Sequence, residues 1–131
     1  DDLDLDTDAR PEVGAMIEVP AAVFLAEEIA HVSDFLAIGT NDLTQFLFAI
    51  RREATTTRRA ALPPLALLRA IELVTKAGAL RAIPVCLCGE WASEPEAVPA
   101  LLGAGLRELS VSPTLAPAVR AAVAASRVSS P

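Results

Sequence analysis

Four short apolar segments alternate with helical patterns along this chain, and this alternation restricts the possible folds more than any other feature. The predicted strands lie at residues 14–19, 34–39, 83–88 and 107–112. Strands separated by helices pair in parallel through right-handed crossovers, and a parallel sheet has both of its faces covered. The sequence therefore predicts an α/β fold in which four βα units build a parallel sheet between helices.

Prolines and glycines mark the predicted helix ends. Pro20 ends the first strand and suits the first turn of a helix. Gly78 is expected to stop the long helix that opens at Pro63-Pro64. The predicted helices span residues 20–32, 63–77 and about 94–103, with a short helix that begins near Asp42 and a last helix after Pro113.

The number of βα units limits the architecture further. A closed barrel needs eight units, so a chain with four is either a small open sheet or half of a barrel. We predict an acidic lead-in at residues 1–11, a half-barrel at residues 12–125 and a flexible tail at residues 126–131. Half a barrel leaves open strand edges near residues 14–19 and 107–112, and open edges pair with other chains. The expected assembly is therefore a homo-oligomer or a heteromer.

Charge and composition exclude two classes of partner. The net charge of −6 argues against nucleic-acid binding, which needs a basic face. No apolar run approaches the roughly 20 residues of a membrane-spanning helix. The acidic N-terminal segment does not resemble a signal peptide, and the two cysteines are expected to stay reduced. These features predict a cytoplasmic protein.

Polar side chains gather where the predicted strands end, and this edge is where α/β folds bind ligands. Glu18 stands near the end of the first strand, and Asp42 follows the second. Mg²⁺ binds one or two carboxylates together with water and substrate oxygens, so both residues are candidate metal ligands. The alternative is that Asp42 caps a helix and that Glu18 faces solvent, and the pattern alone leaves both interpretations open.

Three further residues are candidates for binding or catalysis. The amide of Asn41 can donate a hydrogen bond to phosphate, and the guanidinium of Arg52 can bind phosphate through two hydrogen bonds. The thiol of Cys88 can donate a proton or act as a nucleophile. The alternatives are a turn residue, a solvated basic loop and a small apolar residue, respectively. We assign this last, structural role to Cys86, whose side chain is expected to point to the opposite face of the strand from Cys88.

Four segments of the chain, GAMIEVPAA, DFLAIGTNDLTQF, CLCGE and LLGAGLRELSVSP, occur in this order. Together they resemble the C-terminal part of the phosphoenolpyruvate (PEP)-utilising enzymes. That family includes enzyme I of the bacterial sugar phosphotransferase system (PEP–protein phosphotransferase), pyruvate phosphate dikinase and PEP synthase, and the last segment is most similar to enzyme I. The resemblance covers about residues 12–123 and implies the second half of a TIM-type (β/α)8 barrel.

The resemblance also implies a role for each candidate residue. Glu18 and Asp42 would bind Mg²⁺. Asn41 and Arg52 would bind the phosphate of PEP. Cys88 would protonate the enolpyruvate carbon as pyruvate forms. The full reaction transfers phosphate from PEP to a histidine on a separate domain, and neither that phosphohistidine domain nor the first barrel half is recognised in this chain. We therefore expect the chain to be inactive alone and to need a complementary part.

Other interpretations stay open. A non-catalytic half-barrel would serve dimerisation or the binding of a partner. A different enzyme would use Mg²⁺ and a keto acid on a barrel assembled from two such halves. A fragment of the dikinase or PEP synthase type is a further alternative.

Overall fold

The structure is a computed structural model that describes residues 10–51 and 62–126. The strands are β1 (Gly14–Ile17), β2 (Phe35–Gly39), β3 (Val85–Cys88) and β4 (Glu108–Leu109). The helices are α1 (Pro20–Phe24), α2 (Ala26–His31), α3 (Thr40–Phe48), α5 (Leu65–Arg81), α6 (Val98–Gly103) and α7 (Ala116–Ala125). Two short 3₁₀ helices, η1 (Glu90–Ser93) and η2 (Pro95–Ala97), lie between β3 and α6.

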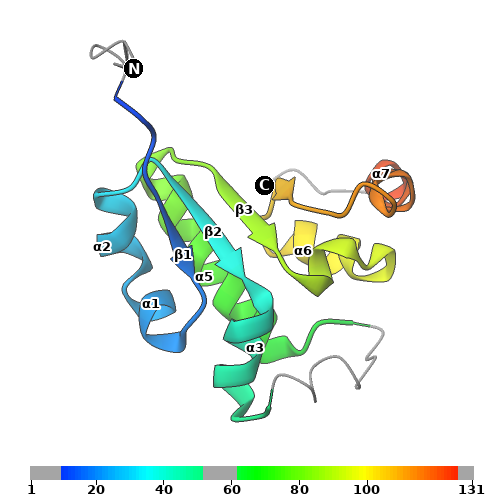
Figure 1. Cartoon of the computed structure of the whole chain (residues 1–131), viewed down its shortest axis with the longest axis horizontal. Helices are drawn as coiled ribbons and strands as arrows, with labels where there is room; N and C mark the ends of the chain where they lie inside the picture. The colour runs from blue at the N-terminus through cyan, green and yellow to red at the C-terminus, as the bar shows by residue number, and fades with distance from the viewer. Residues whose placement is uncertain (1–9, 52–61, 127–131) are drawn as a thin grey trace, which may run out of the picture.

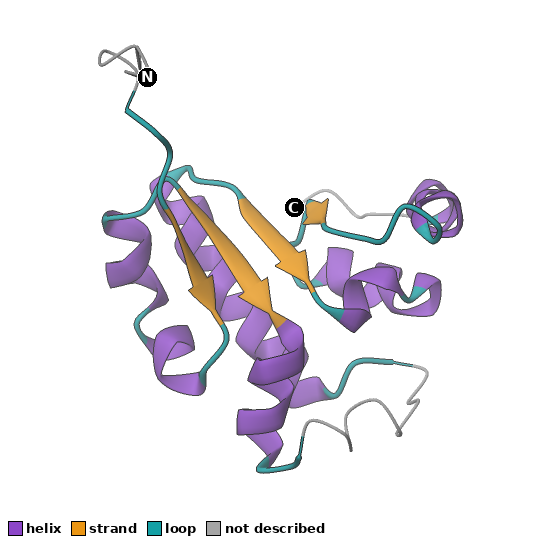
Figure 2. Cartoon of the chain, viewed as in Figure 1, coloured by secondary structure: helices purple, strands orange, loops and turns teal. Residues whose placement is uncertain are grey.

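The four strands form one parallel sheet in the order β1-β2-β3-β4. Figure 1 shows α5 behind the sheet, with α1 and α2 beside it and α6 and α7 toward the β3 side. Figure 2 shows that helices follow the arrowheads of β2 and β3 at the same end of the sheet. The predicted α/β class with four βα units is thus confirmed, and the sheet is consistent with part of an α/β barrel.

The core lies between the sheet and α5. Alternate residues of a strand point to the same face, and one face of this sheet carries the large apolar side chains. The side chains that meet there are fully buried: Leu36, Ile38, Leu87, Leu67, Ile71 and Val74. Burying a side chain of this size stabilises the fold by about 1.5–3 kcal/mol. This packing fixes the positions of the strands, and therefore of the residues at their ends.

The opposite face of the sheet is not covered by the described helices, so the expectation of two covered faces is wrong for this part of the chain. Met16 on this face is 49% exposed, and Phe35 and Ala37 are only half-buried. The side-chain periodicity is nevertheless that of a strand with two distinct faces. The open face, defined by Met16, Phe35, Ala37, Cys86 and Cys88, is the one that a closed barrel would enclose.

Cys86 and Cys88 both lie on the open face, so the predicted opposite orientation of their side chains is wrong. Residues two apart on a strand point to the same side, and Leu87 between them is fully buried on the other side. Both thiols are free and half-buried. Burial, followed by the carboxylate of Glu108, raises the pKa of Cys86.

Helix α5 continues past Gly78, where the sequence predicts its end. It runs to Arg81 and ends at Ala82, whose φ of 55° is left-handed. Gly78 is needed for packing: a Cβ there would lie 2.3 Å from Cγ2 of Val85. The glycine therefore lets the helix approach β3 closely.

Even this long helix does not qualify as a membrane span, and none of the other described helices does.

Two other elements differ from their predicted bounds. The helix expected over residues 20–32 is divided at Leu25, whose φ of −103° and ψ of 18° depart from helical values. This bend allows Val23 and Ala26 to be buried together. The strand expected over residues 107–112 is reduced to two residues, although the N–H of Ser110 still donates to the carbonyl of Leu87 at 2.9 Å.

The segment before β1 is attached to the start of β2 through Asp34. The carboxylate of Asp34 accepts a hydrogen bond from the N–H of Val13 at 2.7 Å and forms an ion pair with Arg10. The hydrogen bond from Val13, and then that from Arg10, lowers the pKa of Asp34. Nearly all of the predicted lead-in and tail lies outside the described residues.

Candidate active site

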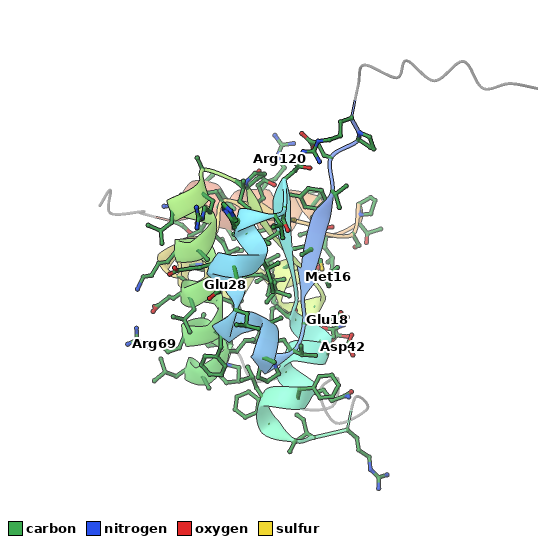
Figure 3. All side chains as sticks on the ribbon, turned by 90° about the vertical axis from the view of Figure 1, so that its left-hand side faces the viewer. Met16, Glu18, Glu28, Asp42, Arg69 and Arg120 are labelled. Atoms are coloured by element: carbon green, nitrogen blue, oxygen red, sulfur yellow. The ribbon has the colours of Figure 1, made fainter. Side chains whose placement is uncertain are left out.

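The candidate residues lie at the carboxyl edge of the sheet. Glu18 directly follows β1, Asn41 and Asp42 lie in the first turn of α3 after β2, and Cys88 ends β3. All four side chains are half-buried. In Figure 3, Met16, Glu18 and Asp42 are labelled at the same side of the molecule, away from the helices that carry Glu28 and Arg69. The fold therefore brings together predicted residues from three consecutive βα units.

Glu18 occupies space that Gly39 leaves open on the neighbouring strand. A Cβ at Gly39 would lie 3.0 Å from Cβ and 3.1 Å from Oε2 of Glu18, and 3.2 Å from Sδ of Met16. The missing side chain of Gly39 thus lets the Glu18 carboxylate lie across the end of β2. The glycine before the Thr-Asn-Asp turn therefore leaves space for the carboxylate of the residue that follows β1.

The helix predicted to begin near Asp42 begins at Thr40, so Asp42 lies inside the first turn of α3. The residue in the N-cap position is Gly39, so Asp42 is not the N-cap residue that one alternative assumed. A carboxylate in the first turn still benefits from the positive end of the helix dipole. The position directs an acidic residue to the same edge of the sheet as Glu18.

Two hydrogen bonds connect the start of α3 to the turn that follows β3. Oγ1 of Thr40, which is fully buried, donates to the carbonyl of Cys88 at 2.9 Å. Oδ1 of Asn41 accepts from the N–H of Glu90 at 3.1 Å. Gly89 between them has a φ of 101°, and a Cβ there would lie 2.4 Å from Oγ1 of Thr40. The close approach of these two segments therefore requires glycine at position 89.

The hydrogen bond from Glu90 also orients the side chain of Asn41. A backbone N–H can only donate, so the atom that faces it is the carbonyl oxygen of the amide. The NH₂ group of Asn41 is then the end that can donate to a ligand, as the predicted role in phosphate binding requires. Arg52, the other predicted phosphate-binding residue, lies outside the described residues.

The thiol of Cys88 faces the sulfur of Met16 and the backbone of β2. Its Sγ lies 3.3 Å from the carbonyl oxygen of Ile38 and 4.0 Å from Sδ of Met16. Burial, and then the negative charge of Glu18, raises the pKa of Cys88. The thiol therefore keeps its proton at neutral pH, which is the state that a proton donor needs.

The donor set at this edge fits a hard divalent cation in part. Glu18 and Asp42 supply two carboxylates, and within residues 10–51 and 62–126 no three His, Cys, Asp or Glu side chains are grouped to hold a metal ion. Mg²⁺ commonly binds one or two carboxylates and takes its remaining oxygens from water and substrate phosphate. Two carboxylates beside an amide donor are thus compatible with Mg²⁺ that is shared with a ligand.

Sequence reasoning missed three residues that shape the site: Thr40, Gly39 and Met16. The signals were available in part, because Gly39-Thr40 immediately precede the candidate Asn41-Asp42 pair. Met16 stands two residues before Glu18 and shares its face of the strand, a relationship that alternation alone could have revealed.

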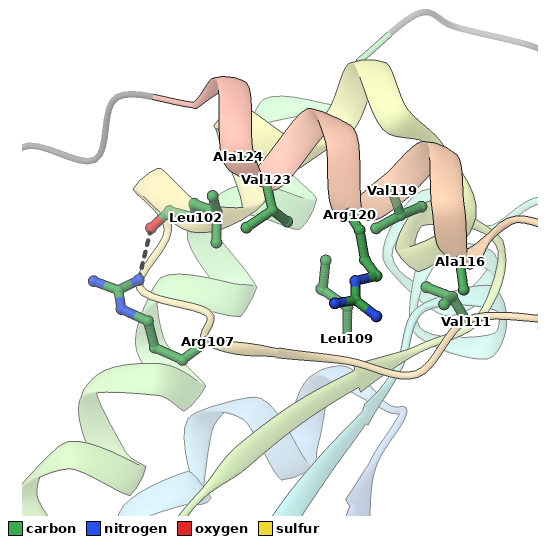
Figure 4. A pocket seen from close by; sticks show the side chains of 9 residues that line it. All are labelled: Leu102, Arg107, Leu109, Val111, Ala116, Val119, Arg120, Val123 and Ala124. Atoms are coloured by element: carbon green, nitrogen blue, oxygen red, sulfur yellow. Dashed lines mark hydrogen bonds between the residues drawn. The ribbon is translucent and has the colours of Figure 1, made fainter.

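A groove lies elsewhere, between β4, α6 and α7. This groove has a volume of about 440 Å³ and is lined by apolar side chains and two arginines, Arg107 and Arg120. Figure 4 shows Arg107 bonded to the carbonyl of Leu102, at 3.1 Å. The residues predicted for the site are not among its lining residues, so we place the candidate chemistry at the sheet edge and not in this groove.

Comparison with known proteins identifies the same group of enzymes as the sequence motifs. Residues 2–128 match the family described as "PEP-utilising enzyme, PEP-binding domain". The matched segment includes every residue of the candidate site.

Several curated relatives are similar over most of this chain. The protein named "Phosphoenolpyruvate-dependent phosphotransferase system" from Escherichia coli (strain K12) is 39% identical over 104 residues, which is 78% of this chain and 14% of the relative. The "Phosphoenolpyruvate-protein phosphotransferase" of Haloferax volcanii is 43% identical over 87% of this chain and 20% of the relative. The protein of the same name from Mycoplasma pneumoniae is 46% identical over 77% of this chain and 18% of the relative. The chain thus spans a fifth or less of the length of these relatives.

Proposed function

The chain belongs to the PEP-utilising enzyme family, and on this premise we propose that it supplies part of a catalytic site that transfers phosphate from PEP to a histidine on a separate domain and releases pyruvate. The family name and the names of the relatives support a PEP-dependent phosphotransferase. The observation that carries the proposal is the meeting of a carboxylate, an amide and a protonated thiol, Glu18, Asn41 and Cys88, at one edge of the sheet.

Cys88 donates the proton that completes the formation of pyruvate. When the phosphoryl group leaves PEP, the enolate of pyruvate remains, and its methylene carbon takes the proton from Sγ of Cys88. The C–H bond forms as the S–H bond breaks, and the thiolate later regains a proton from solvent. The raised pKa of Cys88 supports this role, because it keeps the proton on sulfur until a strongly basic carbon is present.

Glu18 and Asp42 are the residues that would hold Mg²⁺ at this edge of the sheet. When bound, the ion would supply positive charge that stabilises the phosphate and the enolate. The absent side chain of Gly39 leaves room for the Glu18 carboxylate, and the first turn of α3 carries Asp42 at the same edge of the sheet. The NH₂ group of Asn41 donates to the phosphate, and Arg52 binds the same group from the segment that follows α3.

We propose that the complete reaction needs parts beyond the segment that matches the relatives. The relatives are several times longer than the matched segment, and the sheet has strand edges at β1 and β4. We propose that a complementary half-barrel pairs with these edges to complete a (β/α)8 barrel, and that a domain with the acceptor histidine docks to it. Free thiols favour action in the reducing cytoplasm. A dikinase-type enzyme with the same half-site is the second candidate, since the description of the matched family specifies only PEP-utilising enzymes.

Calorimetric titration with PEP tests the proposal directly. The purified chain is titrated with PEP in the presence and in the absence of Mg²⁺. We expect binding that requires Mg²⁺ and that Asp42→Asn abolishes. Glu27→Gln, which changes an exposed carboxylate on α2, serves as the matched control and should bind like the original chain. Binding that is equal with and without Mg²⁺, or equal in Asp42→Asn, would refute the proposed site.

If the chain does not bind PEP at all, a second experiment tests whether the site is divided between two polypeptides. The chain is then titrated after mixing with a second polypeptide that carries the preceding part of a longer relative, such as the one from Haloferax volcanii. Binding restored by the second polypeptide supports a site divided between two parts. A folded mixture that still does not bind PEP favours the non-catalytic half-barrel.

A further inference from the structure

The open face of the sheet carries all of the sulfur atoms in the described part of the chain. Met16 is the only methionine of the sequence, and Cys86 and Cys88 are its only cysteines. All three residues lie on the open face, because they occupy alternate positions of β1 and β3 whose intervening residues, Ile17 and Leu87, are fully buried. Three soft ligands on one accessible face are a feature that the proposed PEP chemistry does not use as a group.

The strand register explains how a side chain of β1 reaches β3. Met16 pairs with Ala37 of β2, which in turn pairs with Cys86 of β3. Gly39, one step further along this face of β2, pairs with Cys88. Ala37 and Gly39 on β2 are small, and Sδ of Met16 lies 3.2 Å from where a Cβ of Gly39 would be.

The distance between the two nearest sulfurs suits a shared metal ion. Sδ of Met16 and Sγ of Cys88 are 4.0 Å apart. Two metal–sulfur bonds of about 2.3 Å each span up to about 4.6 Å, so an ion between these atoms would form a bent S–metal–S unit. The bend leaves room for a third ligand. Met16 is 49% exposed in this chain by itself, so an ion can reach the site when no complementary half covers this face.

Cys86 is the nearest candidate for that third ligand. Two steps of a strand rise about 6.6 Å in total, which separates the backbones of Cys86 and Cys88. The Sγ of Cys86 now lies 3.8 Å from the carbonyl of Leu87, a weak contact for a thiol. Rotation of Cys86 about χ1 to another staggered position brings its sulfur toward Cys88 with little loss of bonding.

We propose that Met16, Cys86 and Cys88 form a binding site for a soft monovalent cation, with Cu(I) as the ion that fits best. Thiolate and thioether ligands select Cu(I), whereas Mg²⁺ prefers carboxylate oxygens. Each thiol releases its proton to solvent as its sulfur–copper bond forms, and no atom is oxidised or reduced. If the proposed PEP chemistry is also correct, copper on Cys88 removes the proton donor and blocks pyruvate formation.

An anaerobic competition titration tests the site without reference to PEP. The full chain competes with a chromophoric Cu(I) chelator in reducing buffer. We expect one Cu(I) per chain and a roughly tenfold or greater loss of affinity in Met16→Leu and in Cys86→Ser. Phe35→Leu, which changes another side chain of the same open face, is the matched control and should keep the original affinity.

The variant Met16→Leu decides between a built site and ordinary thiol binding. It keeps both cysteines, so an unchanged affinity would mean that the thiols alone capture copper and would overturn the proposal. Absence of binding by the folded chain, or more than one ion per chain, would also overturn it.

X-ray absorption spectroscopy at the copper edge, recorded on the copper-loaded original chain, counts the sulfur ligands of the ion. This measurement does not depend on the folding of any variant. A shell of three sulfurs is expected. A shell with fewer sulfurs, or with nitrogen or oxygen in their place, contradicts the proposed ligand set.

Discussion

Thr40 donates its hydroxyl hydrogen bond to the backbone carbonyl of Cys88 at a distance of 2.9 Å. This bond joins the first residue of α3 to the last residue of β3, although the two are 48 positions apart in the chain. The segment with Asn41 and Asp42 is therefore held against the segment with Cys88. The same hydrogen bond therefore holds the proposed phosphate-binding group and the proposed proton donor in position.

Replacement of Thr40 by valine should destabilise the chain. The valine keeps the volume but leaves the carbonyl of Cys88 without this partner, at an expected cost of about 1–3 kcal/mol. Thr44 on the same helix provides the control, because its buried hydroxyl has no hydrogen-bond partner among residues 10–51 and 62–126. Thr44→Val should be neutral or slightly stabilising. Chemical denaturation of both variants measures the difference, and equal stabilities would show that the Thr40 bond contributes nothing.

Replacement of Gly89 by alanine should disrupt the contact between the start of α3 and the end of β3. Its φ of 101° is costly for any residue with a Cβ, and that Cβ would lie 2.4 Å from Oγ1 of Thr40. We expect a loss of about 1–3 kcal/mol of unfolding free energy. Gly103→Ala is the control, since nothing lies within 4 Å of the added Cβ. A thermal melt of Gly89→Ala that matches that of Gly103→Ala would contradict the proposed role of the turn.

Replacement of Gly39 by alanine should weaken the binding of divalent cations more than it weakens folding. The added Cβ approaches Cβ and Oε2 of Glu18 to 3.0 and 3.1 Å, so the carboxylate must move from its position. We expect a loss of roughly tenfold in the affinity for Mn²⁺, used as a probe for Mg²⁺, when the titration is made in the presence of PEP. Electron paramagnetic resonance counts free Mn²⁺ during the titration. An affinity equal to that of Gly103→Ala would argue against Glu18 as a ligand.

The protonation of Cys88 should depend on Glu18. Folding raises the pKa of this thiol above its ordinary value of 9.0 through burial and then through the charge of Glu18. The folded chain thus holds the proton more tightly than the unfolded chain. The associated stability is fully present below the unfolded pKa and is lost as pH rises through the folded pKa.

Thiolate absorbance near 240 nm follows this titration in a Cys86→Ser background. The midpoint should be higher in the folded chain than in denaturant, and Glu18→Gln should lower it. Glu27→Gln on the exposed face of α2 should leave it unchanged. A titration midpoint that is the same with and without Glu18→Gln would mean that the carboxylate of Glu18 does not affect the pKa of the thiol.

The sequence pattern predicted the architecture because the strands are short, apolar and bounded by Pro, Gly and helical repeats. Such local signals suffice for the order of βα units and for the edge at which Glu18, Asp42 and Cys88 meet. The alternation of side chains, applied correctly, also places Cys86 and Cys88 on one face.

Local sequence patterns could not predict the contacts between segments that are distant in the chain. Gly78 suggests a helix stop, yet it lies within α5, where its missing Cβ leaves room for the side chain of Val85. The role of Thr40 depends on the carbonyl of Cys88, which no spacing along the chain reveals. The open face of the sheet likewise reflects the number of strands and not their composition.

The most direct test of the account is nuclear magnetic resonance of the chain with Mn²⁺ and PEP. Bound Mn²⁺ broadens the amide signals of nearby residues. We predict selective broadening at Glu18, Gly39, Asp42 and Cys88 that requires PEP and that Asp42→Asn abolishes. Broadening centred instead on exposed carboxylates of the helices, such as Glu27, would contradict a PEP and metal site at the carboxyl edge of the sheet.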